Sequence, residues 1–318
     1  MKRNSKISGA VILILVASVS TAIILSCAGR SNSAPLETPT AGNIKIVADE
    51  SFEPIIDSQV HVFTGLYNQA FITPKYKPEE DVIKDFMNDS VNVIVTSLKL
   101  SDAQMTILKA KLLEPRTITV AWDALAIIIN KQNYDSLLTY DNVEAIFKGT
   151  ITDWKEINPK SKLGKINIIF DNEKSGNIRY FKEKFKLASL GPNFFAVKSN
   201  SDVVDYVSKS PNSIGIVSVN WISDKDDPKC LSFIKKIRVA GVSPQYITSE
   251  YSYPLQAYLY DKSYPFIRQV NMITRETYYG LGSGFMAFVS SEQGQRVILK
   301  SGLLPATMPI RTIQVVQQ

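Results

Sequence analysis

The most constraining feature of this chain is a repeated alternation of two residue patterns that begins at residue 44. Short runs rich in β-branched residues predict buried strands, and apolar residues spaced three or four apart predict amphipathic helices. Strands alternating with helices form a mostly parallel sheet with helices on its faces. The sequence therefore predicts an α/β protein. Its expected strands are residues 44–48, 71–76, 91–96, 117–120, 124–129, 166–170, 213–218 and 255–260.

The helices are predicted from apolar spacing and capping residues. Trp122-Asp123 interrupts the β pattern and is taken as the first crossing between two lobes. Ser101 with Gln104 forms a capping box, and Gly149 is a helix stop. The expected helices are residues 52–68, 82–87, one opened by Ser101, one capped by Asp141 and Glu144, 178–185, one capped by Ser201, 266–273 and 285–289, and Val297, Ile298 and Leu303 are expected to complete the core.

The first 42 residues predict export and lipid anchoring. Three cations precede an apolar run, residues 11–25, that is placed like a signal-peptide core. The run ends in Ile24-Leu25-Ser26-Cys27, which resembles a bacterial lipobox. We expect a signal peptide over 1–26, lipidation of Cys27, a flexible tether over 27–42 and a periplasmic lipoprotein held to a membrane of the cell envelope. The alternative is an uncleaved membrane anchor with an incidental cysteine.

Composition excludes several classes of function. The formal charge is +6, and removing the three cations of residues 1–26 leaves about +3, too mild and evenly spread for nucleic-acid binding. The single histidine, His61, lies in a helix-spaced apolar segment. A histidine-based metal site or a Ser-His-Asp triad is therefore unexpected. With Cys27 lipidated, Cys230 has no partner for a disulfide and is given no role. We expect no enzyme activity, metal or cofactor; a hydrolase using His61 stays an alternative.

Four segments resemble the PstS-like family, the phosphate-binding proteins of phosphate ABC importers. They are residues 143–154, 212–217, 253–255 and 288–305. The resemblance runs from about residue 43 to 313 and implies a two-lobed type II periplasmic-binding-protein fold. Each lobe is then a mostly parallel sheet flanked by helices, and two hinge strands join them. We expect lobe 1 over 43–122 plus 255–318 and lobe 2 over 123–254.

The family's function is the leading hypothesis. It implies a monomer that captures phosphate or a similar small oxyanion and delivers it to an ABC permease. The alternative is a sensor or scaffold protein on the same fold whose ligand is changed or lost.

Two strand-to-helix loops match the family's ligand loops. Helix N-termini supply backbone N–H donors and a favourable dipole for an anion. Ser51 and Phe52 resemble the first loop, although Ser51 alone is also a plain helix cap. The second loop contains Ser175, Gly176 and Asn177.

Charge is the main departure from the family pattern. Asp171 stands where the family has an arginine, which removes a bidentate cation and adds a carboxylate. Arg179 or Lys174 would restore positive charge. Either Asp171 turns away, the ligand is not phosphate, or a cation lies nearby.

A third loop holds Thr96 and Ser97 as candidate donors, with Lys99 as a further possible cation. The family has an aspartate here that accepts the ligand's proton, and this chain has none before Asp102. The segment 77–79 is a fourth and weaker candidate.

Overall fold

The computed structural model describes residues 37–307. The predicted signal peptide, Cys27 and most of the predicted tether lie outside the described residues. Within 37–307, none of the helices combines the length and the apolar character needed to span a bilayer.

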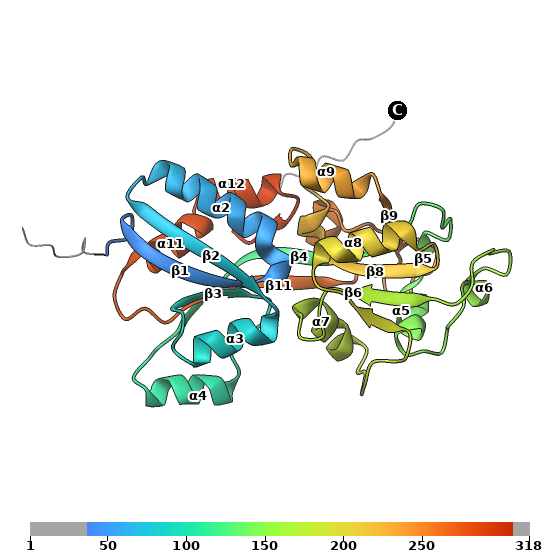
Figure 1. The fold of residues 1–318 in the computed structure, drawn as a ribbon, viewed down its shortest axis with the longest axis horizontal. Coiled ribbons are helices and arrows are strands. Elements are labelled where there is room, and N and C mark those ends of the chain that lie inside the picture. The colour runs from blue at the N-terminus through green and yellow to red at the C-terminus, as the bar shows by residue number, and fades with distance from the viewer. Residues whose placement is uncertain (1–36, 308–318) are drawn as a thin grey trace, which may run out of the picture. The chain divides into compact units, whose positions relative to one another are not determined.

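The secondary structure alternates much as the sequence predicts (Figure 1). The strands are β1 Gly42–Asp49, β2 Ala70–Lys77, β3 Val93–Thr96, β4 Arg116–Asn130, β5 Leu137–Leu138, β6 Asn167–Phe170, β7 Phe194–Ala196, β8 Ser213–Ser218, β9 Ile237–Val239, β10 Gly241–Val242, β11 Ile267–Thr274 and β12 Leu304–Pro305. The helices are η1 Glu50–Phe52, α2 Glu53–Leu66, α3 Glu79–Met87, α4 Asp102–Ala110, α5 Tyr140–Phe147, α6 Trp154–Ile157, α7 Gly176–Lys184, α8 Asn200–Lys209, η2 Val219–Trp221, α9 Pro228–Ile234, α10 Gln256–Tyr260, α11 Leu281–Ser290 and α12 Glu292–Lys300.

The main strand order is β2-β1-β3-β11-β4-β8-β6-β7. β1 pairs in parallel with β2 and β3, and β6 pairs in parallel with β7 and β8. We call the part built on β1–β3 lobe 1 and the part built on β6–β8 lobe 2. Two antiparallel strands, β4 and β11, join these parallel sets. The predicted two-lobed fold with two connecting strands is confirmed.

The predicted break at Trp122-Asp123 is wrong, because β4 is one continuous strand of 15 residues. It pairs with β11 up to Ala124 and with β8 from Leu125 onward. The chain therefore passes between the lobes by changing its pairing partner and keeping its extended backbone.

Two further expectations around the return crossing are wrong. Residues 256–260 form α10 where a strand was expected, and 267–274 form β11 where a helix was expected. β11 lies between β3 and β4, and most of it is buried. Its apolar residues Val270 and Ile273 follow Phe266 at helical spacing because buried polar residues, Arg268 and Asn271, occupy strand positions where apolar residues were expected.

Two helix caps also differ from expectation. Thr139 caps α5, with Asn142 completing its capping box, where Asp141 and Glu144 were expected. Ser199 caps α8 where Ser201 was expected. Thr139 lies two residues before Asp141, and Ser199 lies two residues before Ser201. Gly149, with φ of 73°, follows α5 as predicted.

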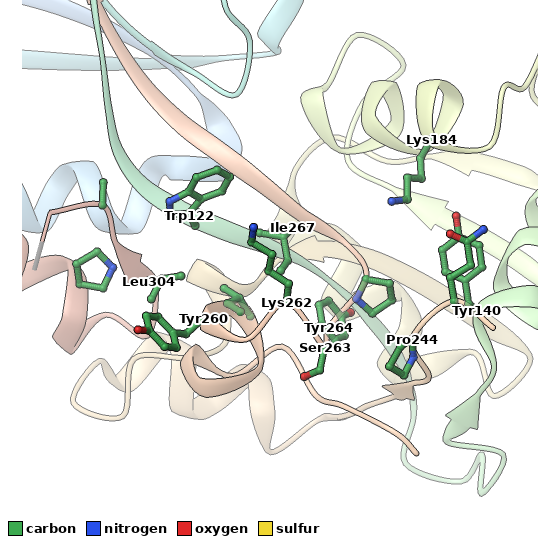
Figure 2. Close-up of a pocket in the computed structure, with 15 residues that line it drawn as sticks. Trp122, Tyr140, Lys184, Pro244, Tyr260, Lys262, Ser263, Tyr264, Ile267 and Leu304 are labelled. Atoms are coloured by element: carbon green, nitrogen blue, oxygen red, sulfur yellow. The ribbon is translucent and has the colours of Figure 1, made fainter. Parts of the chain in front are cut away.

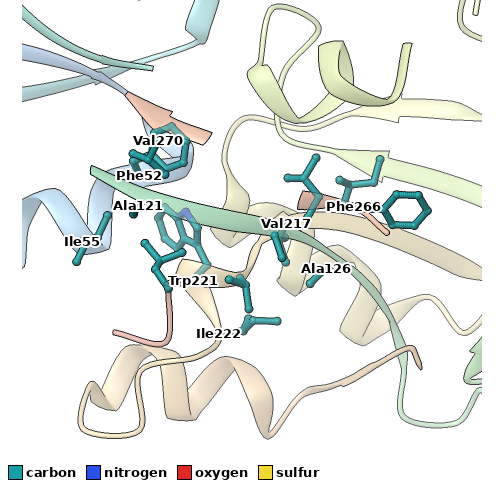
Figure 3. Packing of buried hydrophobic residues seen from close by; sticks show 14 of the residues in the cluster. Phe52, Ile55, Ala121, Ala126, Val217, Trp221, Ile222, Phe266 and Val270 are labelled. Carbon is teal, nitrogen blue, oxygen red and sulfur yellow. The ribbon is translucent and has the colours of Figure 1, made fainter. Parts of the chain in front are cut away.

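One buried apolar cluster extends through both lobes (Figure 3). Phe52 packs in it beside β4, and Trp221 from η2 lies against the same region. The indole N–H of Trp221 donates to the Ser51 carbonyl at 3.1 Å, and the Asn220 amide donates to it at 2.9 Å. The core therefore fixes the loop that follows β1 from the side of lobe 2.

Candidate functional site

The structure brings the first two predicted loops into contact. Ser51 follows β1 in lobe 1, and Asn177 lies in the first turn of α7 in lobe 2. The Ser51 hydroxyl donates to Asn177 Oδ1 at 3.0 Å, across 126 residues of sequence. Both side chains are buried. These loops lie face to face, as an oxyanion site between the lobes requires.

Local sequence explains how α7 presents its first turn. Ser175 is the N-cap, and its hydroxyl accepts from the Ile178 N–H. The first N–H groups of a helix have no intrahelical partner, and the helix dipole favours an anion there. Gly176 allows close approach: a Cβ at this position would lie 2.5 Å from Asp49 Oδ2 and 2.9 Å from Glu79 Oε2.

The third predicted loop reaches the same region but is engaged by a carboxylate. Glu79 Oε1 accepts hydrogen bonds from the Thr96 hydroxyl at 2.8 Å, from the Ser97 N–H at 2.8 Å and from the Ser97 hydroxyl at 2.6 Å. Lys99 is exposed. Glu79 belongs to segment 77–79, the fourth and weaker candidate. It thus accepts hydrogen bonds from the predicted donors of the third loop, Thr96 and Ser97.

Arg179, one turn into α7, reaches the buried polar cluster that Ser51, Asn177 and Glu79 form where the lobes meet. Its Nε donates to Glu79 Oε2 at 2.6 Å and its Nη2 donates to the Ser97 hydroxyl at 2.8 Å. Burial favours the neutral guanidine, but Glu79 outweighs this effect and raises the pKa of Arg179 above its ordinary value. The arginine is therefore a permanent cation bridging α7 to α3.

Asp171 does not turn away to solvent; its side chain lies in the same buried polar cluster. It is buried, and its Oδ1 accepts from the Ser175 hydroxyl at 2.6 Å. Burial raises its pKa to about 6, while the Ser175 hydrogen bond and the charge of Arg268 act in the opposite direction. Of the three possibilities left open by the sequence, the geometry favours a nearby cation.

That cation, Arg268, was missed by the sequence analysis. It lies on β11, is 5% exposed, and its Nε donates to Asp123 Oδ2 at 2.9 Å. Its guanidinium carbon lies 4.8 Å from the centroid of the Phe52 ring. Nη1 and Nη2 are buried and have no hydrogen-bond partner within residues 37–307. β11 also carries Gln269 and Asn271, so Arg268 did not stand out in the sequence, and the segment was predicted as a helix.

Two acidic residues beside Ser51 were also missed. Asp49 Oδ1 accepts from the N–H and the hydroxyl of Ser51, both at 3.0 Å. Its Oδ2 is buried with no partner among the described residues. Burial, reinforced by Glu79 and Asp171 and opposed by Arg268, raises the pKa of Asp49 to about 7. Burial and Asp171 raise the pKa of Glu50 to about 8, although Asn200 donates to its carboxylate.

These pKa shifts predict how stability depends on pH. Asp49, Glu50 and Asp171 titrate higher in the folded chain than the value near 4 of unfolded carboxyl groups. Between about pH 4 and pH 8 the folded chain therefore binds more protons, and its free energy of unfolding falls as pH rises. We expect the melting temperature to drop from pH 5 to pH 8, and to drop less in Asp49→Asn. A melting temperature that rises over this range would contradict the shifts.

A separate cavity of about 570 Å3 lies elsewhere (Figure 2). Its lining is aromatic and aliphatic, with Trp122, Tyr140 and Tyr264 among its walls. Lys184 and Lys262 supply its cations, and both are exposed to solvent. Exposed ammonium groups are screened and hydrated, whereas the Arg268 guanidinium is buried. The buried polar cluster around Arg268 is therefore the candidate anion site.

His61, the residue of the hydrolase alternative, is exposed on α2. Cys230, which was given no role, is buried in α9, and burial raises the pKa of its thiol to about 12. A thiol of that pKa is a poor nucleophile at neutral pH.

Comparison with known proteins decides the family. A family model described as a PBP superfamily domain matches residues 33–293. The chain belongs to the PBP superfamily. The relatives of this PBP include the phosphate-binding protein PstS of Pseudomonas aeruginosa, which is 25% identical over 278 residues, 83% of each chain. PstS of Borreliella burgdorferi is 22% identical over 303 residues, covering 92% of this chain and 98% of the relative. These relatives are binding proteins, not enzymes.

Solved structures agree with the fold. A substrate-binding protein from Clostridium perfringens, solved with bound phosphate, superposes with a TM-score of 0.71 at 20% identity, covering 84% of this chain and all of that one. An ABC-type phosphate transport receptor from Vibrio cholerae gives a TM-score of 0.62 at 19% identity, covering 83% of this chain and all of that one. At these identities the likeness establishes the fold of this PBP.

Proposed function

We propose that this PBP captures phosphate, or a similar small oxyanion, between its lobes and delivers it to an ABC permease. The observation that carries the proposal is the buried guanidinium of Arg268, whose two terminal nitrogens have no partner within residues 37–307. A guanidinium presents paired N–H donors that match an oxyanion, and burying it unpaired is costly. The phosphate-binding names of the relatives make phosphate the first ligand to test.

A calorimetric and thermal-shift screen tests this function. With phosphate at 100 times its Kd, the expected stabilisation is about 2.7 kcal/mol, which raises the melting temperature by several degrees. Sulfate, molybdate and tungstate are the comparison anions. If all four leave melting unchanged and give no heat of binding, the chain does not capture a small oxyanion.

A second candidate is a sensor or scaffold protein on the same fold. One observation favours it: Glu79 already engages Thr96, Ser97 and Arg179. Phosphate uptake by cells, measured with and without this gene, separates the two functions. Unchanged uptake despite phosphate binding in vitro would favour the sensor.

The remaining parts of the proposal concern the whole chain. We propose that Cys27 carries the lipid and that the protein is a monomer. Lobe 1, residues 43–122 plus 255–318, and lobe 2, residues 123–254, then close on each other around the ligand. Rotation of two lobes about connecting strands is a common way to bury a ligand. Metabolic labelling with a fatty acid tests the anchor: a Cys27→Ala chain that still takes up label would disprove it.

A further inference from the structure

We propose that Glu79 is an internal ligand of the cleft, a carboxylate that competes with the incoming oxyanion for the same donors. The inference rests on the proposed function, and it adds a residue that sets affinity. A carboxylate and a phosphate oxygen accept the same charge-assisted hydrogen bonds from arginine, hydroxyl and N–H groups. A carboxylate fixed to the chain therefore serves in place of a diffusible anion.

The hydrogen bonds of Glu79 support this role. Its carboxylate is 1% exposed and accepts from Thr96, from Ser97 through both N–H and hydroxyl, and from Arg179. Three of these donors belong to the loop predicted to hold the ligand, and the fourth to a predicted supporting cation. Burial alone would raise the pKa of Glu79, but Arg179 and Ser97 outweigh it and hold the pKa below its ordinary value. The group is thus an anion at neutral pH.

The contact also joins the two lobes. Glu79 begins α3 beside β3, and Arg179 belongs to α7 of lobe 2 (Figure 1). The Lys174 carbonyl accepts from the Glu80 N–H at 3.2 Å, and the Lys174 ammonium lies 3.3 Å from Asp81. The chain's own groups therefore hold α3 of lobe 1 against α7 of lobe 2.

Competition follows from electrostatics. Asp49 Oδ2 and Glu79 Oε2 both approach Gly176, at the first turn of α7 where an anion would bind. An oxyanion bound at this turn and the charged Glu79 carboxylate would repel each other strongly, because the site is buried. An oxyanion that takes the Ser97 and Arg179 donors must displace Glu79. The carboxylate then lowers affinity for the ligand and, when it returns to these donors, favours ligand release.

The test compares phosphate affinity in the wild type, Glu79→Gln and Glu79→Ala by calorimetry. We expect affinity to rise at least 10-fold in Glu79→Ala and to rise less in Glu79→Gln, whose amide oxygen still accepts hydrogen bonds. Glu183→Gln is the matched control. Glu183 also pairs with Arg179, at 2.7 Å, but its side chain is 65% exposed. A screened pair of this kind contributes little, so the control is expected to change affinity less than 2-fold.

A second readout follows the lobes themselves. Spin labels on exposed positions of α4 and α6 report the distance between the lobes in the full chain. We expect Glu79→Ala to lengthen and broaden this distance when no phosphate is added, and phosphate to restore it. An unchanged distance would show that Glu79 does not hold the lobes together and would overturn the inference.

The outcomes separate this inference from the proposed function. If the wild type binds phosphate and Glu79→Ala binds it equally or more weakly, Glu79 is not a competitor, and the proposed function survives. If neither the wild type nor any variant binds an oxyanion, the proposed function fails, and the interlobe distance still decides whether Glu79 acts as the internal closing contact.

Discussion

Replacing Arg268 with lysine is expected to weaken phosphate binding about 100-fold. Lysine keeps the positive charge beside Asp123 but removes the two terminal N–H groups that have no partner within residues 37–307. Hydrogen bonds to charged groups contribute about 1.5–3 kcal/mol each, and a lysine ammonium does not reproduce the planar fork of arginine. Calorimetry with phosphate measures the loss.

The matched control for this variant is Arg296→Lys. Arg296 is 69% exposed on α12 and pairs with Glu292 one turn away. Its substitution is expected to leave phosphate affinity unchanged. Melting without phosphate checks that Arg268→Lys still folds. A folded Arg268→Lys chain with wild-type affinity would show that the oxyanion does not bind this guanidinium.

Replacing Asp123 with asparagine is expected to reduce the free energy of unfolding by about 3 kcal/mol. Asp123 is fully buried, accepts from Arg268 at 2.9 Å and from the Ser218 hydroxyl at 2.8 Å. Removing one partner of a buried ion pair leaves the other charge uncompensated, which costs about 3–5 kcal/mol. We take the lower end because the nearby acidic groups are partly able to compensate. Chemical denaturation measures the change.

A second buried arginine supplies the comparison. Arg275 pairs with Asp89, whose side chain is 54% exposed, and it also donates to the Phe86 carbonyl and to Asn92. Asp89→Asn is expected to lower the free energy of unfolding much less than Asp123→Asn does, because the Asp89 side chain is exposed and screened. If both substitutions have equally small effects, the Asp123 carboxylate is not what compensates Arg268.

Much of the fold was predictable because its information is local. Strands such as β1 and β3 are short apolar runs, and helices such as α4 carry their own capping box. The return crossing was not predictable in this way. In β11 the buried polar residues Arg268 and Asn271 interrupt the apolar pattern, and two of its apolar residues, Val270 and Ile273, have the spacing of a helix.

The site was only partly predictable for a different reason. Ser51 and Asn177 were expected because each lies at a strand-to-helix junction, where N–H groups are free. The roles of Glu79 and Arg268 depend on partners 100 and 145 residues away in sequence. The sequence around either residue does not indicate which charged side chain it will contact in the fold.

The continuity of β4 has a mechanical consequence. With no loop between its pairing with β11 and its pairing with β8, the lobes have no free swivel at that crossing. Any rotation of one lobe against the other must therefore be taken up as extra twist of the paired β4–β11 ribbon, whose register shifts between Val270 and Asn271. Because twisting paired strands costs energy, we expect the two lobes to have one preferred relative angle and to return to it after opening.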